Sequence, residues 1–175
     1  MATTLEAPPD QVWPWLVQMG WTRAGWYSWD VLDNFAVPSA QRIHPEWQDV
    51  RVGDVLTGMG VPCFEVAALE PPHFLALRSS FDLRSGKHYD PKGRRPRFYT
   101  DGIWAFELKP LPNARTRLIV RTYGSAEPQW LQDIADAVFW QPAHWIMQLR
   151  QFQNLKRLTR ALSMRNVKDA GRSAY

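Results

Sequence analysis

The sequence has a single cysteine, Cys63, and no run of apolar residues that could span a bilayer. One thiol cannot form a disulfide within the chain, and scarce cysteine is typical of a reducing compartment. A membrane-spanning helix needs about 20 apolar residues, and the N-terminus lacks the basic and apolar regions of a signal peptide. We therefore expect a cytoplasmic protein without a membrane span.

Motifs for metal, nucleotide and acyl-transfer chemistry are also missing. The four histidines, at positions 44, 73, 88 and 144, have no close ligand spacing, and only one cysteine could join them. Gly58-Met59-Gly60 lacks the third glycine of a dinucleotide-binding loop. The chain has neither a Gly-Lys-Ser/Thr phosphate loop nor a Gly-x-Ser-x-Gly elbow. We therefore predict no metal site and no cofactor.

Basic residues are concentrated in two segments, 84–97 and 156–172, of a chain whose formal net charge is +4. Such clusters can mark a nucleic-acid contact, and Tyr89, Phe98 and Tyr99 could stack on bases beside the first of them. On small domains these clusters are more often a solvated surface. Nucleic-acid binding is therefore not the favoured interpretation, and the sequence leaves the oligomeric state open.

Hydrophobic residues are plentiful, at 45% of 175 residues, which is enough for one domain with a substantial core. Residues 2–7 predict a short strand. Pro9 and Asp10 then suit the first turn of a helix. Ser28 is predicted to cap a second short helix that runs to residue 35.

From Val52 onward the pattern changes to the period-two alternation of strands, which we expect at 53–56, 63–69, 73–80, 103–109 and 116–123. Residues 82–101 predict a long mobile loop or an irregular hairpin. A helical stretch is expected from about 128 to 162, kinked or restarted at Pro142. We expect one domain over residues 1–163 and a flexible tail over 164–175.

This order of elements predicts an α+β fold. A curved antiparallel sheet must cover its apolar face, and the long C-terminal helix is the only element available to cover it. The helix and the sheet should then enclose a space whose walls come from alternate strand residues.

Six of the ten tryptophans fall between Trp13 and Trp47, a density that indicates an aromatic core or an aromatic-lined pocket. The run Val12–Gly20, the string Gly25-Trp26-Tyr27-Ser28-Trp29-Asp30 and the stretches 43–47, 51–54 and 104–106 resemble the START-like (SRPBCC) superfamily. They are most similar to a bacterial branch related to polyketide cyclase/dehydratase-like proteins. The resemblance covers roughly residues 2–160 and is most specific in roughly the first 55.

The resemblance implies the helix-grip (Bet v 1-like) fold, a curved antiparallel sheet around a long C-terminal helix with two short helices after the first strand. It also implies a deep cavity between sheet and helix that takes lipids, polyketides or other hydrophobic molecules. No catalytic residue carries over, because the superfamily has no universal active-site motif. The basic loop at 82–101 and Pro142 depart from the pattern of the branch.

Strand alternation predicts which side chains face this cavity. Glu65, Arg78, Glu107 and Arg121 fall on one face, where they could pair across strands. The opposite face is almost wholly apolar, and Ala68 is expected on it. With residues from helices and loops added, the candidate cavity lining is Trp26, Tyr27, Trp29, Phe64, Val66, Leu77, Ser79, Trp104, Phe106, Val120, Thr122, Trp140 and His144.

The apolar face favours binding over catalysis. Acid–base catalysis needs titratable groups at the reacting atoms, and the sheet supplies none to the cavity. We therefore favour binding of a hydrophobic small molecule, such as a lipid, a polyketide or an aromatic metabolite. The alternative is a cyclase- or dehydratase-like enzyme that brings at least two of Tyr27, Asp30 and His144 within about 3–4 Å of one another or of one ligand. A third interpretation, a protein-interaction module, requires an exposed patch on the C-terminal helix.

Overall fold

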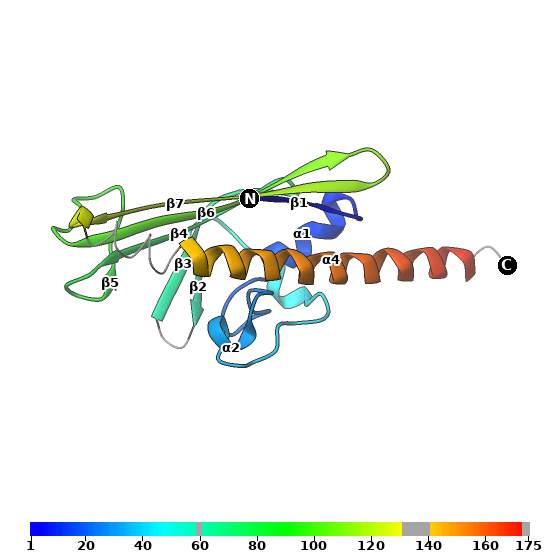
Figure 1. Cartoon of the computed structure of the whole chain (residues 1–175), viewed down its shortest axis with the longest axis horizontal. Coiled ribbons are helices and arrows are strands. Elements are labelled where there is room, and N and C mark those ends of the chain that lie inside the picture. Colours follow the sequence, from blue (N-terminus) through cyan, green and yellow to red (C-terminus); the bar gives the residue numbers. More distant parts are fainter. Residues whose placement is uncertain (59–60, 131–140, 173–175) are drawn as a thin grey trace.

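The predicted alternation of strands and helices is present in the computed structural model of the chain (Figure 1). The structure describes the backbone of residues 1–58, 61–130 and 141–172, and the side chains of 1–56, 64–130 and 144–161. The first elements are β1 (Ala2–Leu5), α1 (Pro9–Val17), α2 (Asp30–Asp33) and the 3-10 helix η1 (Pro45–Trp47). They are followed by β2 (Val55–Gly58), β3 (Val61–Glu70), β4 (Phe74–Asp82), β5 (Lys87–His88), β6 (Tyr99–Leu111), β7 (Arg115–Glu127) and α4 (Gln141–Arg172).

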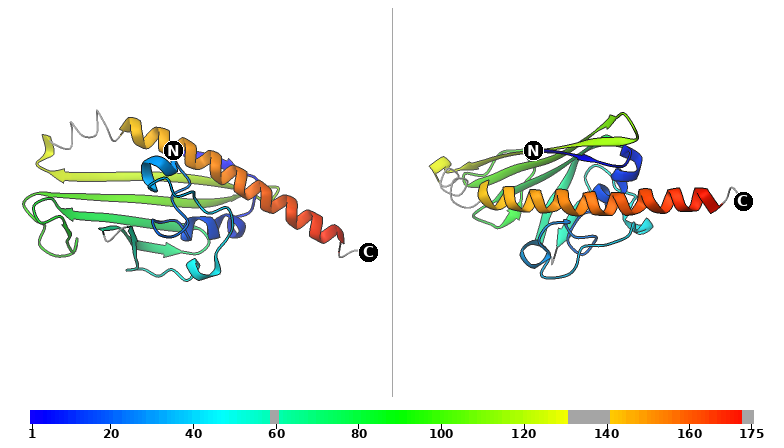
Figure 2. Two further views of the ribbon diagram at one scale, coloured as in Figure 1. Left: turned by 90° about the horizontal axis from the view of Figure 1, so that it is seen from below. Right: turned by 45° about the vertical axis from the view of Figure 1, so that its right-hand side comes forward.

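The strands form one curved, open antiparallel sheet of 7 strands. Its order is β1-β7-β6-β4-β3-β2, with the short β5 paired to β4. The first strand therefore pairs with the last one, β7. The helix α4 lies across one face of the sheet (Figure 2). The predicted α+β class is confirmed, with its curved antiparallel sheet, long C-terminal helix and short helices after the first strand.

The first helix forms as its sequence predicts. Pro9 occupies the first helical position and Asp10 lies in the first turn, where the helix dipole favours a negative charge. Trp15 and Leu16 are buried, so α1 presents one apolar stripe to the core although Pro14 lies inside it. This stripe fixes the start of the tryptophan-rich segment against the sheet.

The predicted cap of the second helix is wrong. α2 covers only Asp30–Asp33, its N-cap is Trp29, and no side chain caps it. The Ser28 hydroxyl donates instead to the carbonyl oxygen of Met147, at 3.1 Å. A tertiary hydrogen bond to α4 therefore replaces the local one, and it attaches the α2 segment to the long helix.

The basic segment 82–101 matches the predicted irregular hairpin and not the mobile loop. It contains β5, in which His88 pairs with Phe81, and it ends in the first residues of β6. The backbone N–H of Leu83 donates to the carbonyl oxygen of Phe98 at 3.0 Å. The segment between these two residues therefore begins and ends where β4 and β6 lie side by side.

The last helix differs from its predicted bounds. Residues 131–140, which belong to the predicted helical stretch, lie outside the described residues, and Pro142 falls in the first turn of α4. The α4 backbone continues past residue 163 to Arg172. The division into a domain over 1–163 and a flexible tail stays a prediction. Among the described residues, no helix combines the length and the apolar character needed to cross a membrane.

Candidate functional site

The concave face of the sheet, which packs toward α1 and α4, carries the side chains that alternation predicts. Val66 pairs with Leu77, Leu77 with Trp104, and Trp104 with Thr122. The next row runs from Leu75 through Phe106 to Val120. All of these except Trp104 and Thr122 are buried, so the apolar face is confirmed.

The prediction fails at Ala68. The register of β3 shifts between Val66 and Ala68, so that Ala68 pairs with Ala76 and Leu69 with Leu75. A bulge adds one residue to one strand, and every later side chain then moves to the opposite face. Leu69, not Ala68, therefore shares the concave face with Leu75.

The opposite face carries the predicted charges. Arg121 donates from Nη1 to Oε2 of Glu107 at 2.7 Å, and Lys109 lies 3.2 Å from the same carboxylate. Glu65 and Arg78 are directly opposite one another in the register. The two hydroxyl residues predicted on the concave face differ in exposure: Ser79 is half-buried and Thr122 is exposed.

Aromatic rings fill the concave face at the centre of the sheet. The Trp26 ring lies 5.6 Å from that of Trp104 and 5.3 Å from that of Phe64, between ring centres. Phe106 lies 4.8 Å from Trp104 in the same measure. The predicted lining residues Trp26, Phe64, Trp104 and Phe106 therefore form one packed cluster, which we call the aromatic cluster.

A pocket of about 450 Å³ lies at the β1 edge of this face, between β1 and α4. We call it the edge pocket. It is lined by Met1, Ala2, Thr3, Trp145, Leu149, Phe152, Gln153 and Lys156. The Met1 backbone bonds both ways with Val120, and Thr3 pairs with Leu118, so the pocket lies on the concave face. None of its lining residues was among the predicted ones.

His144 is the predicted lining residue on α4 that the structure describes. Its ring centre lies 6.4 Å from that of Trp104, edge to face. Burial, with a smaller contribution from the N-terminal ammonium, lowers the pKa of His144. The imidazole is therefore held in its neutral form beside the aromatic cluster. Trp140, the other predicted residue of this segment, lies outside the described residues.

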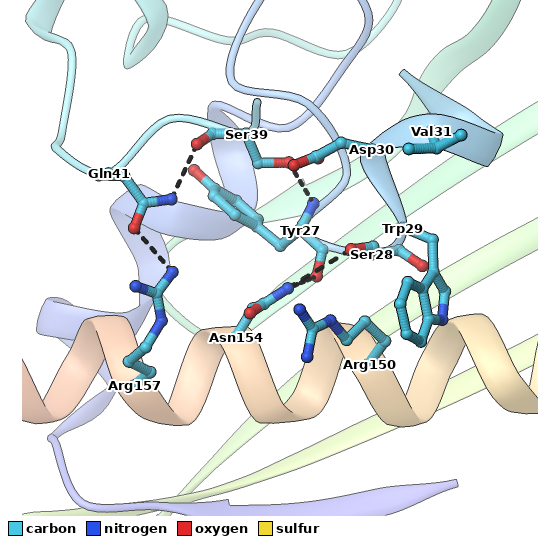
Figure 3. A pocket seen from close by; sticks show the side chains of 10 residues that line it. All are labelled: Tyr27, Ser28, Trp29, Asp30, Val31, Ser39, Gln41, Arg150, Asn154 and Arg157. Atoms are coloured by element: carbon cyan, nitrogen blue, oxygen red, sulfur yellow. Dashed lines mark hydrogen bonds between the residues drawn. The ribbon is translucent and has the colours of Figure 1, made fainter. Parts of the chain in front are cut away.

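A second pocket, of about 270 Å³, lies between the α2 segment and the other side of α4 (Figure 3). We call it the α2 pocket. It is lined by Tyr27, Ser28, Trp29, Asp30, Val31, Ser39, Gln41, Arg150, Asn154 and Arg157. Asn154 donates to the carbonyl oxygen of Tyr27 at 2.9 Å and so ties the wall of the pocket to α4. The predicted Trp29 lies here, 43% exposed, and not on the concave face.

Tyr27 is fixed in the interior of the protein. It is 1% exposed, and the Gln18 side-chain amide donates to its hydroxyl at 2.5 Å. Burial raises the pKa of Tyr27 well above its ordinary value, although the Gln18 hydrogen bond opposes this shift. Just before it, Gly25 has φ +72, and a Cβ there would lie 2.6 Å from Ser39 Oγ, so only glycine fits this turn.

The three candidate catalytic side chains are engaged in separate contacts. Tyr27 is bonded to Gln18, and Asp30 accepts a hydrogen bond from the Ser39 hydroxyl at 2.5 Å. His144 packs on Trp104. No hydrogen bond or ion pair joins any two of the three among the described residues. The described side chains also hold no group of three potential metal ligands.

Sequence reasoning missed the α4 side chains that line the two pockets. Trp145 and Leu149 face the edge pocket, while Arg150 and Arg157 face the α2 pocket. A helical-wheel analysis would have grouped 145 with 149 and 150 with 157. It could not have told which neighbour each group faces, because that depends on where the α2 segment packs.

No protein-family model and no curated protein matches the chain. Among solved structures, the chain is similar to a conserved protein from Geobacillus kaustophilus, with 13% identity, a TM-score of 0.42 and coverage of 91% of this chain and 93% of that one. It is also similar to CalU16 from Micromonospora echinospora, with 14% identity, a TM-score of 0.40 and coverage of 93% of this chain and 83% of that one. A third similar structure is protein MLL2253 from Mesorhizobium loti, with 17% identity, a TM-score of 0.40 and coverage of 90% of this chain and 94% of that one. Similarities this distant assign neither a family nor a function to the chain.

Proposed function

We propose that the protein binds a hydrophobic small molecule between the sheet and α4, with the edge pocket as its site. The observation that carries this proposal is an apolar pocket of about 450 Å³ on the concave face. Ligand pockets usually measure ~300–1,000 Å³ and have mostly apolar walls with few polar groups. Met1, Trp145, Leu149 and Phe152 supply such walls, and Lys156 and Gln153 lie at the polar side.

In this proposal, the site residues predicted on the sheet lie beside the edge pocket and do not line it. Val120 pairs with Met1 at the pocket and with Phe106 on its other side. Phe106 in turn contacts Trp104. These residues continue the floor of the pocket into the aromatic cluster, so a larger ligand would reach them only by displacing packed rings.

Binding is favoured over the cyclase- or dehydratase-like alternative by the positions of the titratable groups. That alternative needs two of Tyr27, Asp30 and His144 close together, and each of them has its own structural partner. Of the three, only His144 is next in the chain to a residue that lines the edge pocket, Trp145. A lone imidazole there could orient a ligand through one hydrogen bond.

The protein-interaction alternative also has its required feature, an exposed apolar patch on α4 formed by Trp145, Ile146 and Leu149. Two of these three side chains line the edge pocket, whereas Ile146 does not. A protein bound to this patch would contact all three side chains, whereas a ligand in the pocket would contact only Trp145 and Leu149. Ile146 therefore provides a matched control.

The test is a titration with N-phenyl-1-naphthylamine, a neutral apolar probe whose fluorescence rises on binding. We expect the double variant Trp145→Ala/Leu149→Ala to raise its Kd at least about tenfold, or ~1.4 kcal/mol. Ile146→Ala should leave the Kd within about twofold. Equal Kd values in all three proteins would contradict the proposal. Native mass spectrometry with solvent extraction of the freshly purified protein would then identify the class of any natural ligand.

A further inference from the structure

Two arginines enter the α2 pocket from α4 without a carboxylate partner among the described residues (Figure 3). The Cζ atom of Arg150 lies 4.8 Å from the centre of the Trp29 ring, and its buried Nε has no acceptor within the described part of the chain. Arg157 donates from Nη2 to the neutral amide oxygen of Gln41 at 2.7 Å. Within the described residues, neither guanidinium therefore forms an ion pair with a carboxylate.

The stacking of Arg150 on Trp29 leaves the guanidinium able to bind an anion. A guanidinium that packs its face on an indole keeps its in-plane N–H groups free, and their fork matches carboxylate and phosphate oxygens. The ring contact also restricts the side chain, so less conformational freedom is lost when a ligand binds. The pocket thus presents a preorganised donor for an oxyanion.

The charge balance of the pocket favours a negatively charged ligand. Its lining contains two arginines and one carboxylate, Asp30, so the formal sum of +2 and −1 is +1. One Asp30 oxygen already accepts the Ser39 hydroxyl. Asn154, between the two arginines in sequence, donates to the Tyr27 carbonyl and adds no charge.

Apolar side chains lie beside these charges. Trp29 and Val31 line the pocket, and Val31 is 77% exposed. Leu32, Phe35 and Val37, which follow it in the chain, are all more than half exposed. Exposed apolar side chains of this size are unusual in one short segment and mark a contact with a ligand or a surface.

We propose that the α2 pocket is a second binding site, separate from the edge pocket, for an amphiphilic oxyanion. Arg150 and Arg157 hold its carboxylate or phosphate group, and its apolar body lies against Trp29 and Val31. At about 270 Å³ the pocket takes the charged end and the adjoining carbons of such a molecule. The oxyanion can belong to a free amphiphile or to a lipid headgroup.

The test uses three probes: decanoate, inorganic phosphate, and phosphatidylcholine vesicles with and without phosphatidic acid. Calorimetry measures the two soluble probes and cosedimentation measures the vesicles. We expect Arg150→Gln/Arg157→Gln to weaken binding of the active probe at least about tenfold. Arg160→Gln, which removes one positive charge at an exposed α4 position outside the pocket lining, should change it less than about twofold. Decanoate binding would identify a free amphiphile, and binding confined to phosphatidic acid vesicles would identify a headgroup.

Two further variants separate guanidinium recognition from simple charge attraction, and the α2 pocket from the edge pocket. Arg150→Lys/Arg157→Lys keeps both charges but loses the planar fork, so it should bind with intermediate affinity. Trp145→Ala/Leu149→Ala should leave oxyanion binding unchanged, because those side chains line the edge pocket. The proposal is overturned if none of the probes binds, or if the double glutamine variant, shown to be folded by circular dichroism, binds as well as the parent protein.

Discussion

The indole rings of Trp26 and Trp104 lie with their centres 5.6 Å apart, which joins the loop after α1 to the middle of β6. Phe64 contacts both rings, at 5.3 and 5.9 Å between centres. Trp26, one of the early tryptophans, therefore covers the centre of the concave face. Packing by the chain itself moves the open space to the sheet edge and to the far side of α4.

Replacement of Trp104 by alanine tests this arrangement. Trp104→Ala should lower the free energy of unfolding by about 3 kcal/mol, because it removes the ring that contacts Trp26, Phe64 and Phe106. Arg121→Ala, which breaks an exposed ion pair worth about 0–1 kcal/mol, should lower this free energy less. Urea unfolding measures both effects. Equal losses in the two variants would contradict the assignment of the sheet faces.

Asp33 predicts a pH-dependent stability. Its side-chain oxygens are buried, and within the described residues the nearby Ser28 hydroxyl donates to Met147. Burial raises the pKa of Asp33 to about 6 and Asp30 adds to the rise, while the Ser28 hydroxyl and the Asp33 backbone N–H oppose it. The native state thus takes up a proton before the unfolded state does, so this group's contribution to stability is lost as pH rises from about 4 to 6.

Asp33→Asn removes the charge and should therefore stabilise the protein by about 2 kcal/mol at pH 8. The gain should shrink as pH falls through the same window and disappear below about pH 4. Chemical denaturation at several pH values measures it. Asp49→Asn, at an exposed ion pair, is the control and should show no comparable pH dependence. A pH-independent effect of Asp33→Asn would show that the carboxyl is not desolvated.

Removal of residues 84–97 should leave the fold intact. Leu83 and Phe98, which flank this segment, are already hydrogen-bonded across the strands. A two-residue Asn-Gly turn can join strands at such a point. Circular dichroism and thermal unfolding of the shortened protein are the measurements. An unfolded product would show that β5 and the Tyr89–Tyr99 ring contact belong to the core.

Gln18 is the buried polar residue whose loss should cost most in the N-terminal segment. It is 0% exposed, and its amide bonds with four groups, on Tyr27, Arg42, His44 and Gln48. Gln18→Leu leaves these groups without their buried partner, so we expect a loss of about 2–4 kcal/mol in unfolding free energy. Gln153→Leu, at an exposed position, should change it by less than about 0.5 kcal/mol. Similar losses in the two variants would show that the hydrogen bonds of Gln18 do not account for the effect.

The fold was largely predictable because its elements carry strong local patterns. Period-two alternation identifies the face of Val66, Leu77, Phe106 and Val120 without knowledge of their neighbours, since the pleat alone determines it. It fails at Ala68, because a bulge changes the phase of alternation and leaves no clear local signal. The Ser28 cap fails for a similar reason, since a distant carbonyl on α4 competes for the hydroxyl.

The pockets were much less predictable than the fold. Their walls combine segments far apart in the chain, such as Met1 with Trp145 and Trp29 with Arg150. The sequence supplied the residue types, including the early aromatic density and the titratable candidates. It could not show that the aromatic rings pack on one another, because burying them against protein or against a ligand satisfies the same hydrophobic requirement.

The helix α4 uses three different faces along one stretch. Gln148, Gln151 and Leu155 are buried against the core, Trp145 and Leu149 face the edge pocket, and Arg150 and Arg157 face the α2 pocket. The same helix is therefore a wall of two separate pockets, which lie on its opposite sides. A ligand that displaced α4 from one pocket would reshape the other, and such a coupling would change both affinities by the same factor.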